Sequence, residues 1–273
     1  MKTRSSRILK LLRQGNLPLV LKCNLSDPRV MEIAGLSGVD GVWLCNEHVP
    51  NDWTGIENQI RAAKLHDIDT IVRVARGSYS DHIKPFEADA TGIMVPHVGS
   101  ADEARQVIDW VRFKPLGRRA MDGGNSDGQY TFLPIKEYMH HSNTERIVIL
   151  QIESPEALEQ VDQIAALPGF DMLLFGPGDF SHRIGKPGEI NDPEVVAARK
   201  KVAGAAKKHG KYAMSAGLFA PMADLVAEGH GLFSIGADVV AISAYCKQRL
   251  EVARGQIDGL PAGLKPKSQS PYA

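Results

Sequence analysis

Residues 147–181, IVILQIESPEALEQVDQIAALPGFDMLLFGPGDFS, decide the fold. A nearly continuous apolar run at 147–152 is followed by a helical pattern at 155–166 and then by a second apolar run at 172–175. Short apolar runs separated by a helical segment are typical of parallel strands joined by a crossover helix. Such strands lack polar alternation because helices cover one side of the sheet and side chains fill the other.

The same alternation continues over most of the chain. Further apolar runs occur at 17–23, 39–45, 69–74, 92–98, 212–216 and 239–244, and further helical patterns occur at 101–111, 193–209 and 222–228. Eight strands that alternate with helices predict one closed (β/α)8 barrel, the TIM barrel. The length of 273 residues suits this fold, which typically needs roughly 250 residues.

The composition argues against several classes of function. The chain has 32 Lys and Arg against 32 Asp and Glu, so its formal net charge is zero. A chain without a basic field is not built mainly to hold nucleic acid or an anionic membrane surface. No apolar run approaches the roughly 20 residues of a membrane span. We therefore expect a small-molecule partner, with no nucleic acid and no membrane.

The cysteines indicate a reducing compartment. Cys23, Cys45 and Cys246 are odd in number and widely spaced, so they predict neither a disulfide framework nor a zinc knuckle. The basic residues 1–14 lack the apolar core of a signal peptide and favour an amphipathic helix. These observations predict a cytoplasmic protein.

Two segments fall outside the repeat. Residues 112–142 contain several glycines and no clear period, so we expect a long loop beyond the fourth strand, on the side of the other strand-to-helix loops. Such a loop is typical of an active-site lid. Residues 255–273 are poor in apolar side chains. We therefore predict a barrel over 1–254 and a flexible tail over 255–273.

Polar residues at the ends of the predicted strands are the candidates for chemistry, because active sites of these barrels lie at the carboxyl ends of the strands. Five strand ends carry them. The candidates are Cys45, Asn46, Glu47, His48, Arg73, His97, Gln151, Glu153 and Asp179.

Glu153 and Asp179 follow consecutive strands and offer carboxylate oxygens, the ligands that hard divalent cations such as Mg²⁺ and Mn²⁺ prefer. Spacing alone leaves a second interpretation open. Glu153 can cap the helix that begins near Ser154, and Asp179 can cap the turn at Ser181.

Arg73 and His48 also have two interpretations each. A guanidinium inside a barrel is costly unless it is paired, so Arg73 predicts either a substrate anion or an internal salt bridge. His48 suits a general base, since its ordinary pKa of about 6.5 lies near working pH, or it has a structural role. The glycine-rich turn at 176–181 either binds an anion through its amides or is simply tight. The other histidines, His97 included, lack metal-ligand spacing and suggest surface or packing roles.

Together these motifs resemble the HpcH/HpaI family of class II, metal-dependent 2-oxo-acid aldolases, which includes 4-hydroxy-2-oxoheptanedioate and 2-keto-3-deoxy-sugar-acid aldolases. The resemblance runs from about residue 15 to 254. It implies a barrel of the phosphoenolpyruvate/pyruvate type, often with the last helix swapped between neighbours, in a homo-oligomer such as a hexamer or a trimer of dimers. The motifs that carry it are 45–52, 72–73, 95–98 with 101–105, 151–154 and 175–181.

The implied activity is the reversible addition of a pyruvate enolate to an aldehyde, and in the cleavage direction the retro-aldol scission of a 4-hydroxy-2-oxo acid. By resemblance, Glu153 and Asp179 bind Mg²⁺, Mn²⁺ or Co²⁺, and Gln151 orients the site. Arg73 would stabilise the enolate oxygen.

The resemblance also assigns roles around the substrate. The amides of Gly178 and Asp179 would hold the pyruvate carboxylate, with Leu218 nearby. His48 would serve the proton transfers. The aldehyde pocket would draw on a neighbouring subunit and on residues of this chain, which are Trp53, Glu87, Arg118 and Asp122.

One position departs from the family. Members usually carry Asp three residues before the histidine, where this chain has Cys45. Either Glu47 or a water replaces that acid, or the base is weaker, or the reaction differs. There are two alternatives to the aldolase. A thioester lyase similar to the citrate-lyase β subunit and malyl-CoA lyase would share the barrel and the Glu/Asp pair, but that group tends to carry acids where this chain has Cys45 and Asn46. A non-catalytic relative that only binds pyruvate would have lost the acid that orients the histidine.

Overall fold

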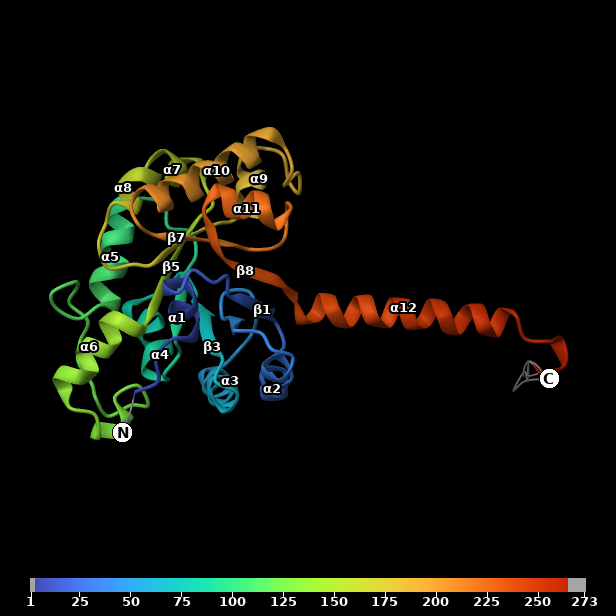
Figure 1. The fold of residues 1–273 in the computed structure, drawn as a ribbon, viewed down its shortest axis with the longest axis horizontal. Coiled ribbons are helices and arrows are strands. Elements are labelled where there is room, and N and C mark those ends of the chain that lie inside the picture. Colours follow the sequence, from blue (N-terminus) through green and yellow to red (C-terminus); the bar gives the residue numbers. More distant parts are fainter. Residues whose placement is uncertain (1–2, 265–273) are drawn as a thin grey trace.

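The computed structural model describes residues 3–264 and confirms the barrel. Eight parallel strands pair in sequence order, and the eighth closes onto the first. The helices lie outside this barrel (Figure 1). The strands are β1 (Leu19–Cys23), β2 (Gly41–Cys45), β3 (Asp69–Arg73), β4 (Gly92–Val95), β5 (Ile147–Ile152), β6 (Met172–Phe175), β7 (Tyr212–Ser215) and β8 (His230–Ala237).

A helix, or a pair of helices, follows each strand, and after β1 to β7 the chain returns to the start of the next strand. No helix within residues 3–264 has both the length and the apolar character needed to cross a membrane. The helices are α1 (Arg7–Arg13), α2 (Pro28–Leu36), α3 (Trp53–Leu65), α4 (Tyr79–Glu87), α5 (Ala101–Val111), α6 (Ile135–Glu145), α7 (Pro155–Glu159), α8 (Val161–Ala165), α9 (Pro177–Arg183), α10 (Pro193–Lys208), α11 (Met222–Glu228) and α12 (Asp238–Asp258), with short 3-10 turns at Gln129–Thr131 and Ala262–Leu264.

The barrel interior is filled by apolar side chains up to the carboxyl end. One buried cluster combines α1 with inward residues of the strands, among them Val20, Trp43, Ile71 and Ile149. Because side chains alternate along a strand, the residue two positions later points to the same side. Two residues further along these strands, the side chains that line the barrel change from apolar to polar. The next inward residues on these four strands are Lys22, Cys45, Arg73 and Gln151.

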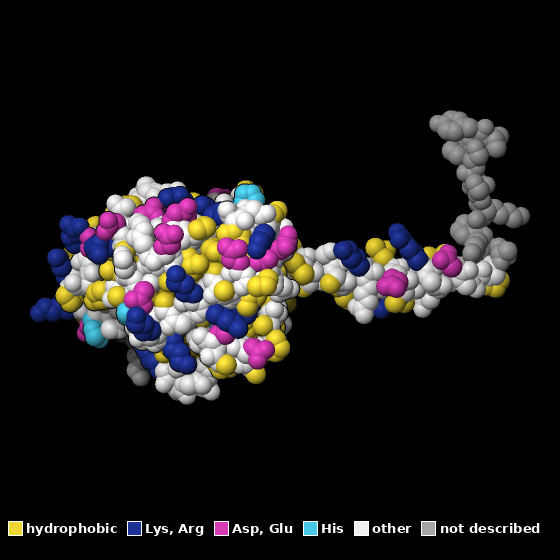
Figure 2. All heavy atoms as spheres, turned by 90° about the horizontal axis from the view of Figure 1, so that it is seen from above, with side chains coloured by type: hydrophobic (Ala, Val, Ile, Leu, Met, Phe, Trp, Pro, Cys, Tyr) yellow, Lys and Arg dark blue, Asp and Glu magenta, His cyan; other side chains and the backbone are white. Residues whose placement is uncertain are grey.

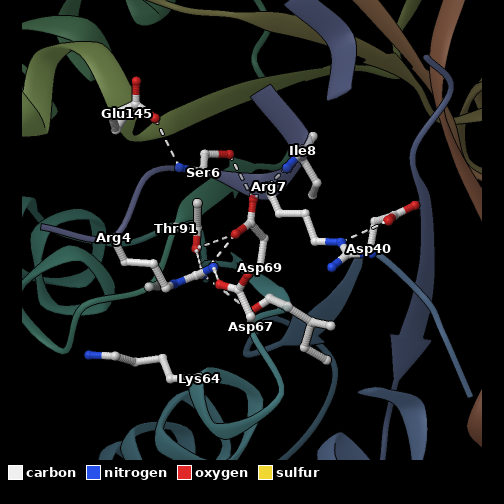
Figure 3. Close-up of polar contacts among 12 residues, drawn as sticks. Arg4, Ser6, Arg7, Ile8, Asp40, Lys64, Asp67, Asp69, Thr91 and Glu145 are labelled. Atoms are coloured by element: carbon white, nitrogen blue, oxygen red, sulfur yellow. Dashed lines mark hydrogen bonds and ion pairs between the residues drawn. The ribbon is translucent and has the colours of Figure 1, made fainter. Parts of the chain in front are cut away.

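The opposite, amino-terminal end is closed by α1 and a polar network (Figure 3). Asp69 is fully buried at the start of β3. Its carboxylate accepts hydrogen bonds from Ser6 Oγ at 2.7 Å, from the Ile8 amide at 2.9 Å and from Arg4 at 2.7 Å. Because α1 packs over this end, we expect the active site at the other end, at the carboxyl ends of the strands.

The predicted eighth strand at 239–244 is wrong. β8 is His230–Ala237, and residues 239–244 belong to the exposed helix α12. Glycines at 231 and 236, together with polar residues, interrupt the apolar pattern of β8. Residues 239–244 of α12 form a nearly continuous apolar run, and this run is more typical of a buried strand than the sequence of β8 is.

The long loop predicted at 112–142 is also placed wrongly. It contains α6, and it follows α5 rather than β4, so it starts near the amino end of the barrel. The Arg112 side chain fixes it there, donating to the carbonyls of Gly169 at 2.7 Å and Arg146 at 3.0 Å, just before β6 and β5. The segment therefore begins at the end of the barrel opposite the carboxyl mouth, unlike the lid that the sequence predicts.

α12 extends away from the barrel as a single helix (Figures 1 and 2). It continues through Gly255 to Asp258, so these four residues of the predicted tail are helical. Residues 265–273, the end of that tail, lie outside the described part of the chain.

Candidate active site

The predicted polar residues come from adjacent strand ends and gather at one mouth. Cys45 and Arg73 are the last residues of β2 and β3, and Gln151 lies near the end of β5. Glu47, His97 and Glu153 follow β2, β4 and β5 by one or two residues, and Asp179 lies in the first turn of α9 after β6.

Arg73 is held on three sides. Its Nε lies 3.0 Å from Glu47 Oε2, and its Nη2 donates a hydrogen bond to Cys45 Sγ at 3.1 Å. The guanidinium stands over the ring of Trp43, 5.2 Å from the ring centre. The internal ion pair predicted as one alternative is therefore present, and it fixes the direction of a buried cation at the mouth.

His97 links two carboxylates. Its Nε2 lies 3.2 Å from Glu47 Oε1, and its Nδ1 lies 2.9 Å from Glu153 Oε1. The His97 amide donates to the same Glu153 oxygen at 2.7 Å, with φ at 53° in the left-handed region. The interpretation of His97 as a surface or packing residue is therefore wrong. Its place directly after a strand end was the signal in the sequence.

Glu153 is a buried carboxylate that lines a cavity of about 350 Å³ together with His97. Burial raises the pKa of Glu153, and the charge of Asp179 raises it further, although His97 acts in the opposite direction. A Cβ at Gly176 would lie only 2.4 Å from Glu153 Oε2, so this carboxylate needs glycine opposite it. Gln151 donates to Glu153 Oε2 at 3.0 Å, while the buried Gln151 Oε1 has no hydrogen-bond partner among residues 3–264.

Neither carboxylate acts as a helix cap. Ser154 caps α7 by accepting a hydrogen bond from the Ala157 amide, and Gly176 stands at the start of α9. Asp179 is exposed, and the space around Gly178 is open. The carboxylates of Glu153 and Asp179, with the Gln151 Oε1 that has no partner among the described residues, offer the oxygen ligands that a hard divalent cation prefers. Water or substrate would complete the shell of such a cation. Within residues 3–264, no group of three or more Asp, Glu, His or Cys side chains is placed to hold a metal.

Cys45 occupies a charged setting although it is buried. Burial raises the pKa of its thiol, but hydrogen bonds from the His48 amide and the Arg73 guanidinium outweigh burial and bring the pKa below its ordinary value. His48 itself is largely exposed, and its Nε2 lies 3.5 Å from Glu47 Oε2. Glu47 thus lies where a carboxylate can contact both His48 and Arg73.

Comparison with known proteins identifies the family. The model of the HpcH/HpaI aldolase/citrate lyase family matches residues 19–243. The chain belongs to this family. It is therefore an enzyme of the aldolase class of carbon–carbon lyases, and the resemblance inferred from the motifs is confirmed.

Three similar proteins illustrate the range of HpcH/HpaI relatives. A 2-keto-3-deoxy-L-rhamnonate aldolase from Escherichia coli O17:K52:H18 is 28% identical over 91% of this chain and 93% of its own length. A 5-keto-4-deoxy-D-glucarate aldolase from Klebsiella pneumoniae is 31% identical over 81% of this chain and 84% of its own length. The solved structure of the citrate synthase SbnG has a TM-score of 0.85 at 27% identity, covering 94% of this chain and 100% of that one.

The structure brings only some of the residues predicted for the aldehyde pocket together within one chain. Trp53 on α3 and Glu87 on α4 line one cavity of about 420 Å³, together with Asn125, Ser126 and Tyr130 of the segment after α5. Arg118 lies against α5 and Asp122 lies in the loop after it, while Leu218 is exposed between β7 and α11. Their assignment to one pocket stays a prediction.

Proposed function

We propose that this HpcH/HpaI enzyme is a divalent-metal-dependent pyruvate aldolase that cleaves a 4-hydroxy-2-oxo acid, such as a 2-keto-3-deoxy sugar acid, into pyruvate and an aldehyde. The observation that carries the proposal is the buried Glu153, placed beside Asp179 and linked through His97 and Glu47 to Arg73. A cation site and a fixed guanidinium at one mouth suit a reaction that develops negative charge on an oxygen.

Glu153 and Asp179 would hold Mg²⁺, Mn²⁺ or Co²⁺, and Gln151 would orient Glu153 through its hydrogen bond of 3.0 Å. When bound, the cation supplies Lewis-acid polarisation of the 2-oxo group. His97 would keep one Glu153 oxygen in place through its amide.

Arg73 would face the oxygen on which charge builds up as the enolate forms. Its ion pair with Glu47, the Cys45 thiol and the Trp43 ring fix the guanidinium before substrate arrives. Fixed donors contribute more than mobile ones because they need no reorganisation during the reaction. The amides of Gly178 and Asp179, at the start of α9, would hold the pyruvate carboxylate.

His48 would carry protons to and from the 4-hydroxyl group. Glu47 would take over the role of the family's missing acid, since its Oε2 is 3.5 Å from His48 Nε2. A nearby carboxylate stabilises the imidazolium and so makes the histidine a stronger base.

We also propose a homo-oligomer in which α12 packs on a neighbouring barrel. Its apolar side chains Val240, Tyr245 and Ile257 are more than half exposed, and so are Ile33 and Leu36 on the outer side of α2. Apolar patches of this kind mark interfaces. A swap of α12, as in a hexamer, would cover both surfaces, and sedimentation of the full chain would test it.

A reducing cytoplasm remains our proposal for the compartment. Cys23, Cys45 and Cys246 are all free thiols in the structure, and two of them are buried. Such thiols persist where disulfides do not form.

The direct test is pyruvate release from 2-keto-3-deoxy-L-rhamnonate and from 5-keto-4-deoxy-D-glucarate, measured on chelated enzyme and after Mg²⁺, Mn²⁺ or Co²⁺ is returned. We expect release from at least one acid, only with metal. Release that is unaffected by chelation would contradict the metal site. No release from either acid would favour the thioester lyase or the non-catalytic alternative.

A further inference from the structure

Lys22 places a second cation at the mouth, beside Arg73. It lies near the carboxyl end of β1, opposite Trp43 in the strand register, and its inward direction follows that of Val20. Its Nζ lies 5.2 Å from the centre of the Trp43 ring, the same distance at which the Arg73 guanidinium stands from that ring. The two cations therefore share one indole.

The carboxylates near Lys22 are already engaged. Glu47 faces Arg73 and His97. Asp238 accepts hydrogen bonds from the backbone amides of Asn24 and Leu25 at 2.9 Å each. Among residues 3–264, the Lys22 ammonium has no ion pair and no hydrogen bond, and its contact is with the Trp43 ring.

A half-buried ammonium without an anion, next to a guanidinium, is electrostatically unfavourable. Burial and the charge of Arg73 accordingly lower the pKa of Lys22. An anion bound beside Lys22 at the mouth would counteract the effects of burial and of Arg73 on its pKa, since an opposite charge nearby favours the charged amine.

Lys211 shows what a lysine with a purely structural role looks like in this barrel. It also lies over an aromatic ring, with Nζ 4.6 Å from the centre of Phe170, and burial lowers its pKa too. However, the Lys211 ammonium donates a hydrogen bond to the Phe170 carbonyl at 2.8 Å. Lys211 directly precedes β7, so this contact lies at the amino end of the barrel. The Lys22 ammonium has a similar contact with the Trp43 ring, but among the described residues it has no carbonyl or carboxylate oxygen as acceptor.

We propose that Lys22 binds a carboxylate on the acceptor and thereby selects aldehydo acids or 2-oxo acids as acceptors. This inference rests on the proposed function, in which the pyruvate carboxylate is bound by the amides at the start of α9. The anion at β1 must then belong to the other reactant. The favoured substrates for cleavage are accordingly 4-hydroxy-2-oxo acids with a second carboxylate.

The experiment is the aldol addition of pyruvate to two matched sets of acceptors. Glyoxylate and succinic semialdehyde carry a carboxylate, whereas glycolaldehyde and propanal carry none. For Lys22→Met we expect the ratio of kcat/KM for anionic over neutral acceptors to fall by about tenfold to a hundredfold, the size of a lost charge-assisted contact. Lys22→Arg should restore most of the ratio, and Lys211→Met should leave it unchanged.

An unchanged ratio in Lys22→Met, or an equal loss for both kinds of acceptor, would overturn the inference. Borohydride reduction in the presence of pyruvate would separate a different role, because a covalent adduct at Lys22 would make it a nucleophile and contradict anion binding. Metal-dependent exchange of the pyruvate methyl protons by the wild type tests the proposed function independently. Its absence would overturn the proposed function and the Lys22 inference together.

Discussion

The two ends of the barrel use charge in opposite ways. At the amino end, each Asp69 oxygen has partners in α1 or the preceding segment, including Ser6 and Arg4. At the carboxyl end, Lys22 has no anion and Gln151 Oε1 has no donor among the described residues. Satisfied buried charges contribute to holding a fold together, whereas unsatisfied ones indicate a place for a ligand. The polar residues that stabilise the fold thus lie at the amino end of the barrel, and those proposed for the chemistry lie at the carboxyl end.

The largest expected effect is on the carboxyl end, in Glu153→Gln. Loss of one metal-binding carboxylate should lower metal-dependent pyruvate release by about a thousandfold or more, equivalent to roughly 4 kcal/mol in the barrier. Glu156→Gln is the matched control, since Glu156 is a nearby exposed carboxylate on α7. Glu153→Gln should unfold at the temperature of the wild type or above it, and Glu156→Gln should unfold close to the temperature of the wild type. Full activity in Glu153→Gln would remove the metal site from this account.

The amino end should respond in stability instead. Asp69→Asn leaves Arg4 without its buried partner, and we expect a loss of about 3 kcal/mol in the free energy of unfolding, measured by urea denaturation. Asp67→Asn removes the exposed Arg4 contact at 3.1 Å and should cost under about 1 kcal/mol. Equal losses in the two variants would contradict the view of Asp69 as the centre of the closed end.

A smaller effect at the amino end depends on pH. Burial, with help from Arg146, lowers the pKa of His141 to about 4 from its usual 6.5. The unfolded chain therefore binds the proton first as pH falls, and stability contributed by the neutral ring is lost between about pH 6.5 and 4. In His141→Gln, the fall in unfolding free energy between pH 7 and 4 should be about 2 to 3 kcal/mol smaller than in the wild type.

The exposed neighbour His140 supplies the control for that measurement. His140→Gln should keep the pH dependence of the wild type, because the His140 side chain is already exposed in the folded chain. If His141→Gln keeps it as well, burial of this ring does not govern the acid sensitivity of the amino end.

The smallest change expected is a gain, in Cys45→Asp. An aspartate would accept the hydrogen bonds that Arg73 and the His48 amide now donate to the Cys45 thiol, and it would restore the acid usual in the family. We expect turnover to rise by a few-fold, the scale of a modest gain in base strength. Cys45→Asn tests whether the charge is required. An unchanged or lower turnover in Cys45→Asp would indicate that Glu47 already performs this role.

The sequence predicted the barrel more fully than it predicted the mouth. Seven of the strands have the expected places because their apolar runs are continuous, and β8 was missed because Gly231 and Gly236 interrupt its run. Glu153 and Arg73 were found from their positions at strand ends. The contacts of His97 and the half-buried cation of Lys22 are not predictable in this way, because they depend on which strands become neighbours and on which way each side chain points.

The measurement that tests the central claim most directly is exchange of the pyruvate methyl protons in D₂O, followed by proton NMR. We expect exchange by the full chain with Mg²⁺, Mn²⁺ or Co²⁺, none after chelation, and none in Glu153→Gln with metal returned. No aldehyde is needed, so the result depends only on the carboxyl mouth. Absence of exchange with all three metals, or exchange that persists in Glu153→Gln, would contradict the claim that this mouth forms the enolate of pyruvate.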